Sequence, residues 1–508
     1  MDAACDAFYQ IYKSGGRSDL VKNILEQLDF HPLSVTLLAT VAYHNKWDTH
    51  RLSREWGRQQ TDVLQTQHNE SLSTTIELSL ASPMFQELGP DARELLGVIA
   101  FFPQGVDENN IDWLFPTLSN RMNIFDNFCI LSLTYRSNGF ITMLAPLQNY
   151  LCPKDPASSP LLRATKDHYF HRLSVFVSPG APGFNEAQWI VSEDINAEHL
   201  LGVFTSINAD SISVWDACIH FMEHLRWHKR RLVMLGPKIK GLPDDHPSKP
   251  MCLFQLSQLL HSVGNYVEEK QLLVQTLTFW RKQKNDHLVA ETLRFISNVN
   301  RRLNLYDEGI KQAKEAVEIY KQLNDTPGQA YSWQELGRLL YSSKQLDTAE
   351  EAISQAINLL DKDEQVMICR CHRTFGDISN SKGEVEEAIS HFETALRIAS
   401  SFNWHHEQFW IHHSLAQLFS EQERFNDAHT HVEHAKLHAV NDSYQLSCAM
   451  QLQAEIWYKQ NRLKEAMSEV LSAANAYEKI GAVKDVEVCK EILKNIEEAM
   501  NRSVATYK

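Results

Sequence analysis

The chain is poor in glycine and proline, has no C-x-x-C pair and has no long apolar run. The absence of such a pair among its 9 cysteines suits reduced thiols in the cytosol. No stretch approaches the roughly 20 apolar residues that span a bilayer, and residues 1–20 lack the basic start and apolar core of a secretory signal. With 19 glycines, 16 prolines and 43% apolar residues in 508, the composition is typical of a well-packed, mostly α-helical protein. We expect a cytoplasmic protein outside the membrane.

Sequence signatures of catalysis are also missing. No G-x-x-x-x-G-K-[S/T] phosphate loop occurs, and no strand followed by an acidic Walker B residue. The hydrolase signatures G-x-S-x-G and H-E-x-x-H are absent as well. The net charge of −15 argues against broad binding of nucleic acid or lipid. We therefore predict a protein that is not an enzyme and holds no cofactor.

Small residues recur at a fixed spacing across the second half of the chain. Three columns share a period of 38 to 40 residues, and the second and third follow the first by 12 and 19 residues. Small side chains let two helices approach closely, and such a pattern repeats only if the helix pair repeats. The sequence thus predicts an array of helix pairs. The columns are Ser297, Gly337, Gly376, Ala416 and Ala454; Gly309, Ala349, Ala388, Ala428 and Ala466; and Ala316, Ala356, Ala395, Ala435 and Ala473.

The best-formed unit contains, in this order, Trp333, Leu336-Gly337, Leu346, Ala349, Ile353 and Ala356. This order resembles the pattern of the tetratricopeptide repeat (TPR), with aliphatic residues in two aromatic places. The resemblance covers residues 251–494 and includes a weaker first copy at 256–276, which makes about six units. The unit is longer than the usual 34 residues, so we expect longer helices. The predicted fold is mostly α, an α-solenoid of TPR helix pairs preceded by a helical subdomain and a small winged-helix domain.

Two proline-rich breaks, residues 152–160 and 236–250, divide the chain, because proline disfavours helix at itself and at its predecessor. We expect a helical subdomain at 1–60, a winged-helix-like domain at 61–152, a helical spacer at 153–245 and the TPR superhelix at 246–500. Within the second region, Asn138-Gly139 between the apolar runs Ser132–Arg136 and Phe140–Leu144 predicts a β-hairpin.

The first two regions contain the segment Asp-Phe-His-Pro-Leu-Ser-Val at residues 29–35 and the segment Ile-Thr-Met-Leu-Ala-Pro-Leu at residues 141–147. With these segments they resemble the rear part of the NB-ARC module of STAND signalling NTPases. Residues 29–35 look like that family's Gly-Leu-Pro-Leu-Ala segment, residues 71–144 look like its winged helix, and 141–147 occupy the place of its Met-His-Asp motif. The layout is most similar to TPR-containing STAND proteins of filamentous fungi. The resemblance implies that Pro32 stacks by the nucleotide and that Met143 belongs to its sensor. Leu144-Ala145 stand where His-Asp would be, so we expect a truncated or degenerated member that does not hydrolyse ATP.

The TPR pattern also predicts which first-helix residues line the groove of the array. Arginine there suits a carboxylate ligand, because guanidinium groups bind carboxylates in a bidentate way. Some TPR domains clamp the C-terminal carboxylate of a peptide, and Asn298, Arg338 and Arg373 are the nearest equivalents, although the usual lysines are absent. We expect a protein or peptide partner with an acidic or C-terminal segment; the alternative is that the arginines pair with acidic neighbours inside the array. The predicted groove residues are Arg294, Asn298, Gln334, Arg338, Tyr341, Arg370, Arg373, Asp377, Asn380, Trp410, His413 and Gln417, with Arg301 and Arg302 near the same rim.

Histidines crowd residues 405–438, and His431, His434 and His438 share one helical face. That spacing could suit a metal, but no cysteine or carboxylate completes a set, so a solvated or interface face is the favoured interpretation and no metal is predicted. His220, His224 and His228 are interpreted as core and surface residues of an aromatic-rich helix.

The sequence thus favours a protein-recognition scaffold or sensor, with self-association possible. A second hypothesis is a nucleotide-dependent switch whose phosphate-binding core is supplied by sequence upstream or by another chain. Nucleic-acid binding through the winged helix is disfavoured, because the chain is acidic and lacks a basic recognition helix.

Overall fold

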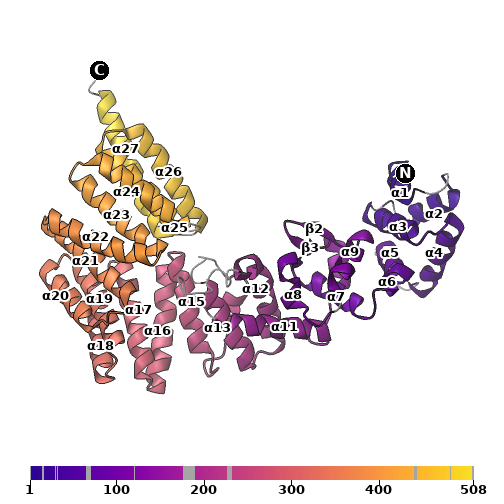
Figure 1. The fold of residues 1–508 in the computed structure, drawn as a ribbon, viewed down its shortest axis with the longest axis horizontal. Helices are drawn as coiled ribbons and strands as arrows, with labels where there is room; N and C mark the ends of the chain where they lie inside the picture. Colours follow the sequence, from indigo (N-terminus) through magenta and orange to yellow (C-terminus); the bar gives the residue numbers. More distant parts are fainter. Residues whose placement is uncertain are drawn as a thin grey trace. The chain divides into compact units, whose positions relative to one another are not determined.

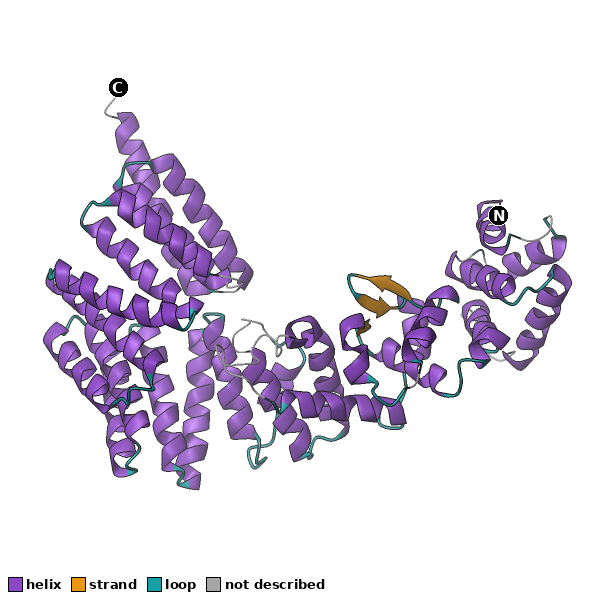
Figure 2. Cartoon of the chain, viewed as in Figure 1, coloured by secondary structure: helices purple, strands orange, loops and turns teal. Residues whose placement is uncertain are grey.

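A computed structural model describes residues 2–13, 17–28, 30, 32–63, 70–118, 120–175, 189–225, 232–439, 443–480 and 482–505. The described residues are almost entirely α-helical, with one small sheet (Figure 2). They form two compact units: the N-terminal unit, residues 1–175 and 189–209, and the C-terminal unit, whose described part starts at Asp210. Among the described helices, none has both the length and the apolar character needed to cross a membrane.

The N-terminal unit begins with five helices around one apolar core. Phe8, Leu25, Leu38 and Trp56 meet in that core, each from a different helix. Pro32 occupies the first position of its helix, where the missing N–H costs no hydrogen bond. The helices are α1 (Asp2–Tyr12), α2 (Asp19–Gln27), α3 (Pro32–His44), α4 (Thr49–Val63) and α5 (Glu70–Leu80).

A three-stranded antiparallel sheet of order β1-β3-β2 follows, made of β1 (Val106–Asp107), β2 (Tyr135–Ser137) and β3 (Phe140–Thr142). The β2–β3 hairpin predicted from Asn138-Gly139 is present, and both turn residues have positive φ, as a tight hairpin turn requires. Gly105 lets β1 approach β3, since a Cβ there would lie 2.2 Å from the carbonyl oxygen of Ile141. The strands are shorter than expected because Ser132 has a φ of 59° and Leu144 caps the next helix.

The helices around the sheet are tied together by a buried carboxylate. Glu193 accepts hydrogen bonds from Tyr169 Oη at 2.6 Å, Asn110 Nδ2 at 2.8 Å and Asn196 Nδ2 at 2.9 Å. Three donors satisfy a group that burial would otherwise destabilise. The elements are α6 (Pro83–Gln86), α7 (Asp91–Phe101), the 3₁₀ helix η1 (Glu108–Asn110), α8 (Ile111–Leu114), α9 (Arg121–Ile130), α10 (Ala145–Leu151), α11 (Pro160–Leu173) and α12 (Trp189–Ile207).

The C-terminal unit is an α-solenoid. Its described helices are two leading helices, six successive helix pairs and one closing helix (Figure 1). They are α13 (Ile212–Leu225) and α14 (Leu235–Lys240); the pairs α15 (Lys249–Ser262) with α16 (Tyr266–Gln283), α17 (Asp286–Arg302) with α18 (Tyr306–Gln322), α19 (Thr326–Ser342) with α20 (Leu346–Leu359), α21 (Gln365–Lys382) with α22 (Val385–Ser401), α23 (His405–Glu421) with α24 (Phe425–His438), and α25 (Ser443–Lys459) with α26 (Leu463–Ile480); and α27 (Val483–Ala505).

Every pair turns with the same backbone geometry. One residue per turn has positive φ, and the N–H of the next residue bonds to the carbonyl five residues back at 2.8 to 3.0 Å. This is the Schellman pattern that satisfies the last carbonyls of a helix. Four of the six positions are not glycine, so the left-handed conformation is held by the turn. The positions are Gly264, Asn304, Lys344, Gly383, Glu423 and Asn461.

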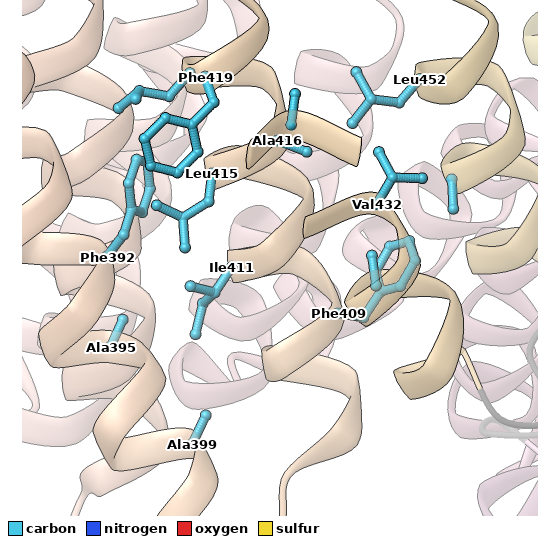
Figure 3. Packing of buried hydrophobic residues seen from close by; sticks show 14 of the residues in the cluster. Phe392, Ala395, Ala399, Phe409, Ile411, Leu415, Ala416, Phe419, Val432 and Leu452 are labelled. Carbon is cyan, nitrogen blue, oxygen red and sulfur yellow. The ribbon is translucent and has the colours of Figure 1, made fainter. Parts of the chain in front are cut away.

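The small-residue columns lie where helices cross. A Cβ on Gly337 would meet Ile353 Cδ1 at 2.5 Å, and one on Gly376 would meet the Phe392 ring at 2.6 to 2.9 Å. Figure 3 shows Phe392 beside Leu415 and Phe419, in the cluster that joins the fourth and fifth pairs. Neighbouring pairs therefore share buried apolar clusters, each of which spans the junction between pairs, as repeat arrays require.

Candidate functional site

The candidate site is the surface that the first helices of successive pairs share, called here the first-helix face. It is made by α17, α19, α21, α23 and α25. All predicted groove residues lie on the first four of these helices. Their polar side chains bond mostly to the first helix of the neighbouring pair, so they form a chain of contacts along the array.

The best-defined part is the arginine cluster, defined as Asn298, Arg301, Glu335 and Arg338. Glu335 Oε2 lies 3.2 Å from both Asn298 Nδ2 and Arg338 Nη1, and its Oε1 lies 3.4 Å from Arg301 Nε. The Glu335 side chain is 5% exposed, whereas the side chains of Arg301 and Arg338 are 13% and 23% exposed. Burial acts to raise the pKa of Glu335, but Arg338, Arg301 and Arg294 outweigh it and hold the pKa below its ordinary value. Two guanidinium groups thus share one carboxylate.

Two further arginines have their own acidic partners. Arg370 Nη2 lies 2.6 Å from Glu407 Oε1 and joins α21 to α23. Burial acts to raise the pKa of Glu407, but Arg370 and His406 outweigh this effect and hold the pKa well below its ordinary value. Arg373 Nη1 lies 3.9 Å from Asp377 Oδ2 on the same helix, a looser pair. Burial raises the pKa of Asp377 despite Arg373.

The remaining groove residues are polar or aromatic. Asn380 Nδ2 donates to Glu421 Oε2 at 2.7 Å, and Gln417 Nε2 donates to the other oxygen at 3.1 Å. The Trp410 ring lies 5.7 Å from that of His413. Burial, and then the charge of Arg373, lower the pKa of His413 to about 4.

Arg294 and Tyr341 extend the face toward neighbouring rings and hydroxyls. The Arg294 guanidinium lies 4.4 Å from the Phe295 ring centroid and 6.0 Å from that of Tyr331. Tyr341 Oη accepts a hydrogen bond from Ser381 Oγ at 3.4 Å. The Arg294 guanidinium also hydrogen-bonds the side chain of Tyr320 on α18.

The alternative that the arginines pair with acidic neighbours inside the array is therefore confirmed for Arg338, Arg370 and Arg373. Some donors nevertheless stay unused. Among the described residues, Arg301 Nη2, Gln334 Nε2 and Arg373 Nε are buried atoms with no hydrogen-bond partner. Gln334 is 5% exposed, and an unpaired buried donor costs about 1–3 kcal/mol.

Sequence reasoning missed the acidic residues of this face. Glu335, Glu407 and Glu421 hold the predicted basic and amide groups in place, yet none recurs from unit to unit. What marks these acidic residues in the sequence is their distance along the chain from the side chains they bond, and not a motif. Each lies 34 to 41 residues after the side chain that it bonds, about one repeat along the chain.

The residues carried over from the NB-ARC resemblance lie in the N-terminal unit. Pro32 is exposed at the start of α3, and Met143 is buried directly after β3. Asp29 and His31, which belong to the motif around Pro32, lie outside the described residues.

The histidines of α23 and α24 form a histidine cluster of His405, His412, His431, His434 and His438. His412 Nδ1 lies 2.9 Å from His431 Nδ1, and the His412 ring stacks on those of His434 and His438 at 5.0 and 5.6 Å. Within the described part of the chain, no three histidine, cysteine or acidic side chains are placed to share a metal ion.

Of the second predicted histidine group, His220, His224 and His228, the structure describes the first two. On α13, His224 is buried and His220 Nδ1 lies 3.2 Å from Glu223 Oε2. His228 falls outside the described residues.

Comparison with known families identifies the repeats. A family model described as tetratricopeptide repeat matches residues 288–362 and 371–436. These residues span α17 to α24, the four central pairs. The array is therefore an α-solenoid of TPR helix pairs.

Known proteins of similar sequence or structure are distant. No curated protein sequence matches the chain. A STAND protein with a TPR sensor from Pyrococcus horikoshii is 12% identical, with 99% of this chain and 72% of that chain covered and a TM-score of 0.49. A Rap protein complexed with competence and sporulation factor is 13% identical, with 66% of this chain and 99% of that chain covered and a TM-score of 0.43. Aspartyl phosphate phosphatase F from Bacillus subtilis is 13% identical, with 66% of this chain and 92% of that chain covered and a TM-score of 0.37.

Proposed function

We propose that the TPR array binds an acidic or C-terminal segment of a partner protein on its first-helix face, and that the chain is a recognition scaffold without NTPase activity. The observation that carries the proposal is the unequal pairing in the arginine cluster, where Arg301 and Arg338 share Glu335. A second carboxylate, supplied by a ligand, would satisfy the idle donors of Arg301 and Gln334.

Arginine suits this role better than lysine would. Its planar fork presents several N–H groups at once, so one side of Arg338 can stay on Glu335 while the other meets a ligand. A partly desolvated site also strengthens the attraction, because the effective dielectric constant there is lower than in water.

A binding experiment with synthetic peptides tests the proposal. Fluorescence polarisation would compare acidic peptides that end in a free carboxylate with the same peptides amidated, against the whole chain. The double variant Arg338→Glu and Arg373→Glu should lose binding by at least about 100-fold, since each reversed charge repels the ligand. The matched control is Arg424→Glu with Arg462→Glu, which makes the same charge change at exposed positions in two pair turns. Equal affinity of the wild type and the first variant would refute the proposal.

We further propose that residues 1–152 are the rear part of an NB-ARC module, a helical subdomain followed by a winged-helix domain, with 153–245 as spacer and 246–500 as the sensor. Support comes from the motif around Pro32, the place of Met143 after the hairpin, and the helix-and-hairpin order of this region. In this interpretation the protein is a cytoplasmic remnant of a STAND regulator and can self-associate. The chain should neither hydrolyse ATP nor copurify with ADP; ADP in the purified protein, measured by chromatography after denaturation, would favour the alternative of a nucleotide-dependent switch.

A further inference from the structure

The first pair of the array touches the element that follows the last pair. Gly264, in the turn between α15 and α16, is buried, and a Cβ built on it would lie 3.3 Å from both Cα and Cβ of Ala482. The same position lies 3.9 Å from Asp485 Oδ2, at the start of α27. Ala482 is fully buried. Backbone and side chain therefore meet with no room for water, which marks a packed contact.

A second contact joins the same ends of the array through side chains. The Arg302 guanidinium, at the end of α17, lies 5.9 Å from the ring centroid of Tyr266 on α16. Tyr266 raises the pKa of Arg302 above its ordinary value, and Tyr444, Cys448 and Asp485 of α25 and α27 act in the same direction against the opposing effect of burial. Arg302 thus lies among groups from both ends.

These contacts close the line of first helices. Polar side chains link α17 to α19, α19 to α21 and α21 to α23, as described above, and α23 packs against α25. The contact of Gly264 with Ala482 brings the two ends of the array together, and Arg302 of α17 and Tyr444 of α25 interact electrostatically beside it. The first-helix face consequently follows a closed circuit, and side chains such as Arg338 keep part of their surface accessible within it.

We propose that the closed array encircles its ligand, and that the segment it accepts carries a free chain end. This inference rests on the proposed function of the first-helix face. A chain terminus enters a closed circuit lengthwise as a single strand. An internal loop has to enter as two adjacent strands, which are about 4.8 Å apart before their side chains are counted, or else the contact between Gly264 and Ala482 has to open.

The test compares one acidic sequence in two forms. The first is a linear peptide with free ends, and the second is the same sequence held between two folded domains. The wild-type chain should bind the bracketed form at least about tenfold more weakly than the free form, a difference of one decade in the dissociation constant. If neither form binds, the proposed function fails; if both bind equally, the function stands and the closed-array inference fails.

A variant that opens the contact makes the test specific. Gly264→Leu places a side chain against Ala482 and should bring the two affinities within about threefold of each other. Gly383→Leu is the matched control, because Gly383 has the same turn geometry, with a φ of 83° against 75°, and nothing within 4 Å of an added Cβ. The control should keep the wild-type preference for the free end. If both variants lose the preference for the free end, the contact between Gly264 and Ala482 is not its cause, and the closed-array inference fails.

Discussion

Acidification should loosen the α23–α24 pair, because five histidines meet there. His412 is 7% exposed and is surrounded by His431, His434 and His438 of α24. Burial, reinforced by the charge of these neighbours when protonated, lowers the pKa of His412 to about 3. Burial also lowers the pKa of His431 and of His438, which lies beside His405.

The size of the effect follows from the two states of His412. Unfolded, the imidazole titrates near its ordinary pKa of 6.5, and folded it titrates near 3. A lowered pKa means that the stabilisation is fully present above pH 6.5 and is lost as the pH falls from 6.5 toward 3. At pH 5.5 the loss from His412 alone is about 1.4 kcal/mol relative to neutral pH, since one pH unit corresponds to 1.36 kcal/mol.

Urea denaturation followed by circular dichroism at 222 nm, at pH 7.5 and 5.5, measures this loss. His412→Phe keeps a ring in the stack and removes the titration, so its free energy of unfolding should fall between the two pH values by about 1.4 kcal/mol less than that of the wild type. The control is His50→Phe, which removes an exposed histidine of α4, and it should retain the wild-type difference.

An equal pH dependence in the wild type and in His412→Phe would refute the reasoning. The comparison between the two proteins isolates His412, because other groups, such as Asp377 with its raised pKa, titrate equally in both.

Three further predictions concern stability. Gly376→Ala should destabilise the array by about 1–3 kcal/mol because the new Cβ would press on the Phe392 ring, whereas Gly57→Ala in α4, with nothing within 4 Å, should stabilise by up to about 1 kcal/mol; equal shifts in melting temperature would contradict this. Glu335→Gln should cost about 3 kcal/mol in urea denaturation, since it leaves two guanidinium groups without their carboxylate, and a cost near zero would show that the cluster is not a partly buried ion pair. Lys344→Gly should stabilise by about 0.5–1 kcal/mol because Lys344 has a φ of 63°, and a lower urea midpoint would count against this account of the turn.

The array could be predicted from the sequence because its spacing constraint is local. Gly337 and Gly376 sit where a neighbouring side chain leaves no space for a Cβ, so small residues recur there in every unit. The residues with positive φ in the pair turns, in contrast, could not be predicted from the sequence. Lys344 and Glu423 adopt positive φ without being glycine, because the Schellman hydrogen bonds fix the backbone whatever the side chain.

The candidate site could be predicted only as a set of residue types. The TPR pattern indicated that Arg338 and Arg370 would share one face, but their partners Glu335 and Glu407 depend on how far each unit is shifted along its neighbour. The contact of Gly264 with Ala482 depends on the twist accumulated over six units. No periodicity in the sequence encodes that sum.

Open repeat arrays fray from their ends, because a terminal repeat has one neighbour where a central one has two. The contact between Gly264 and Ala482 gives α27, which otherwise packs mainly on α26, a second neighbour; it also adds a neighbour to the first pair, which already packs between α13–α14 and α17. Amide hydrogens of α15, α16 and the start of α27 should consequently exchange with solvent as slowly as those of the central pairs, and melting should proceed without progressive loss from either terminus.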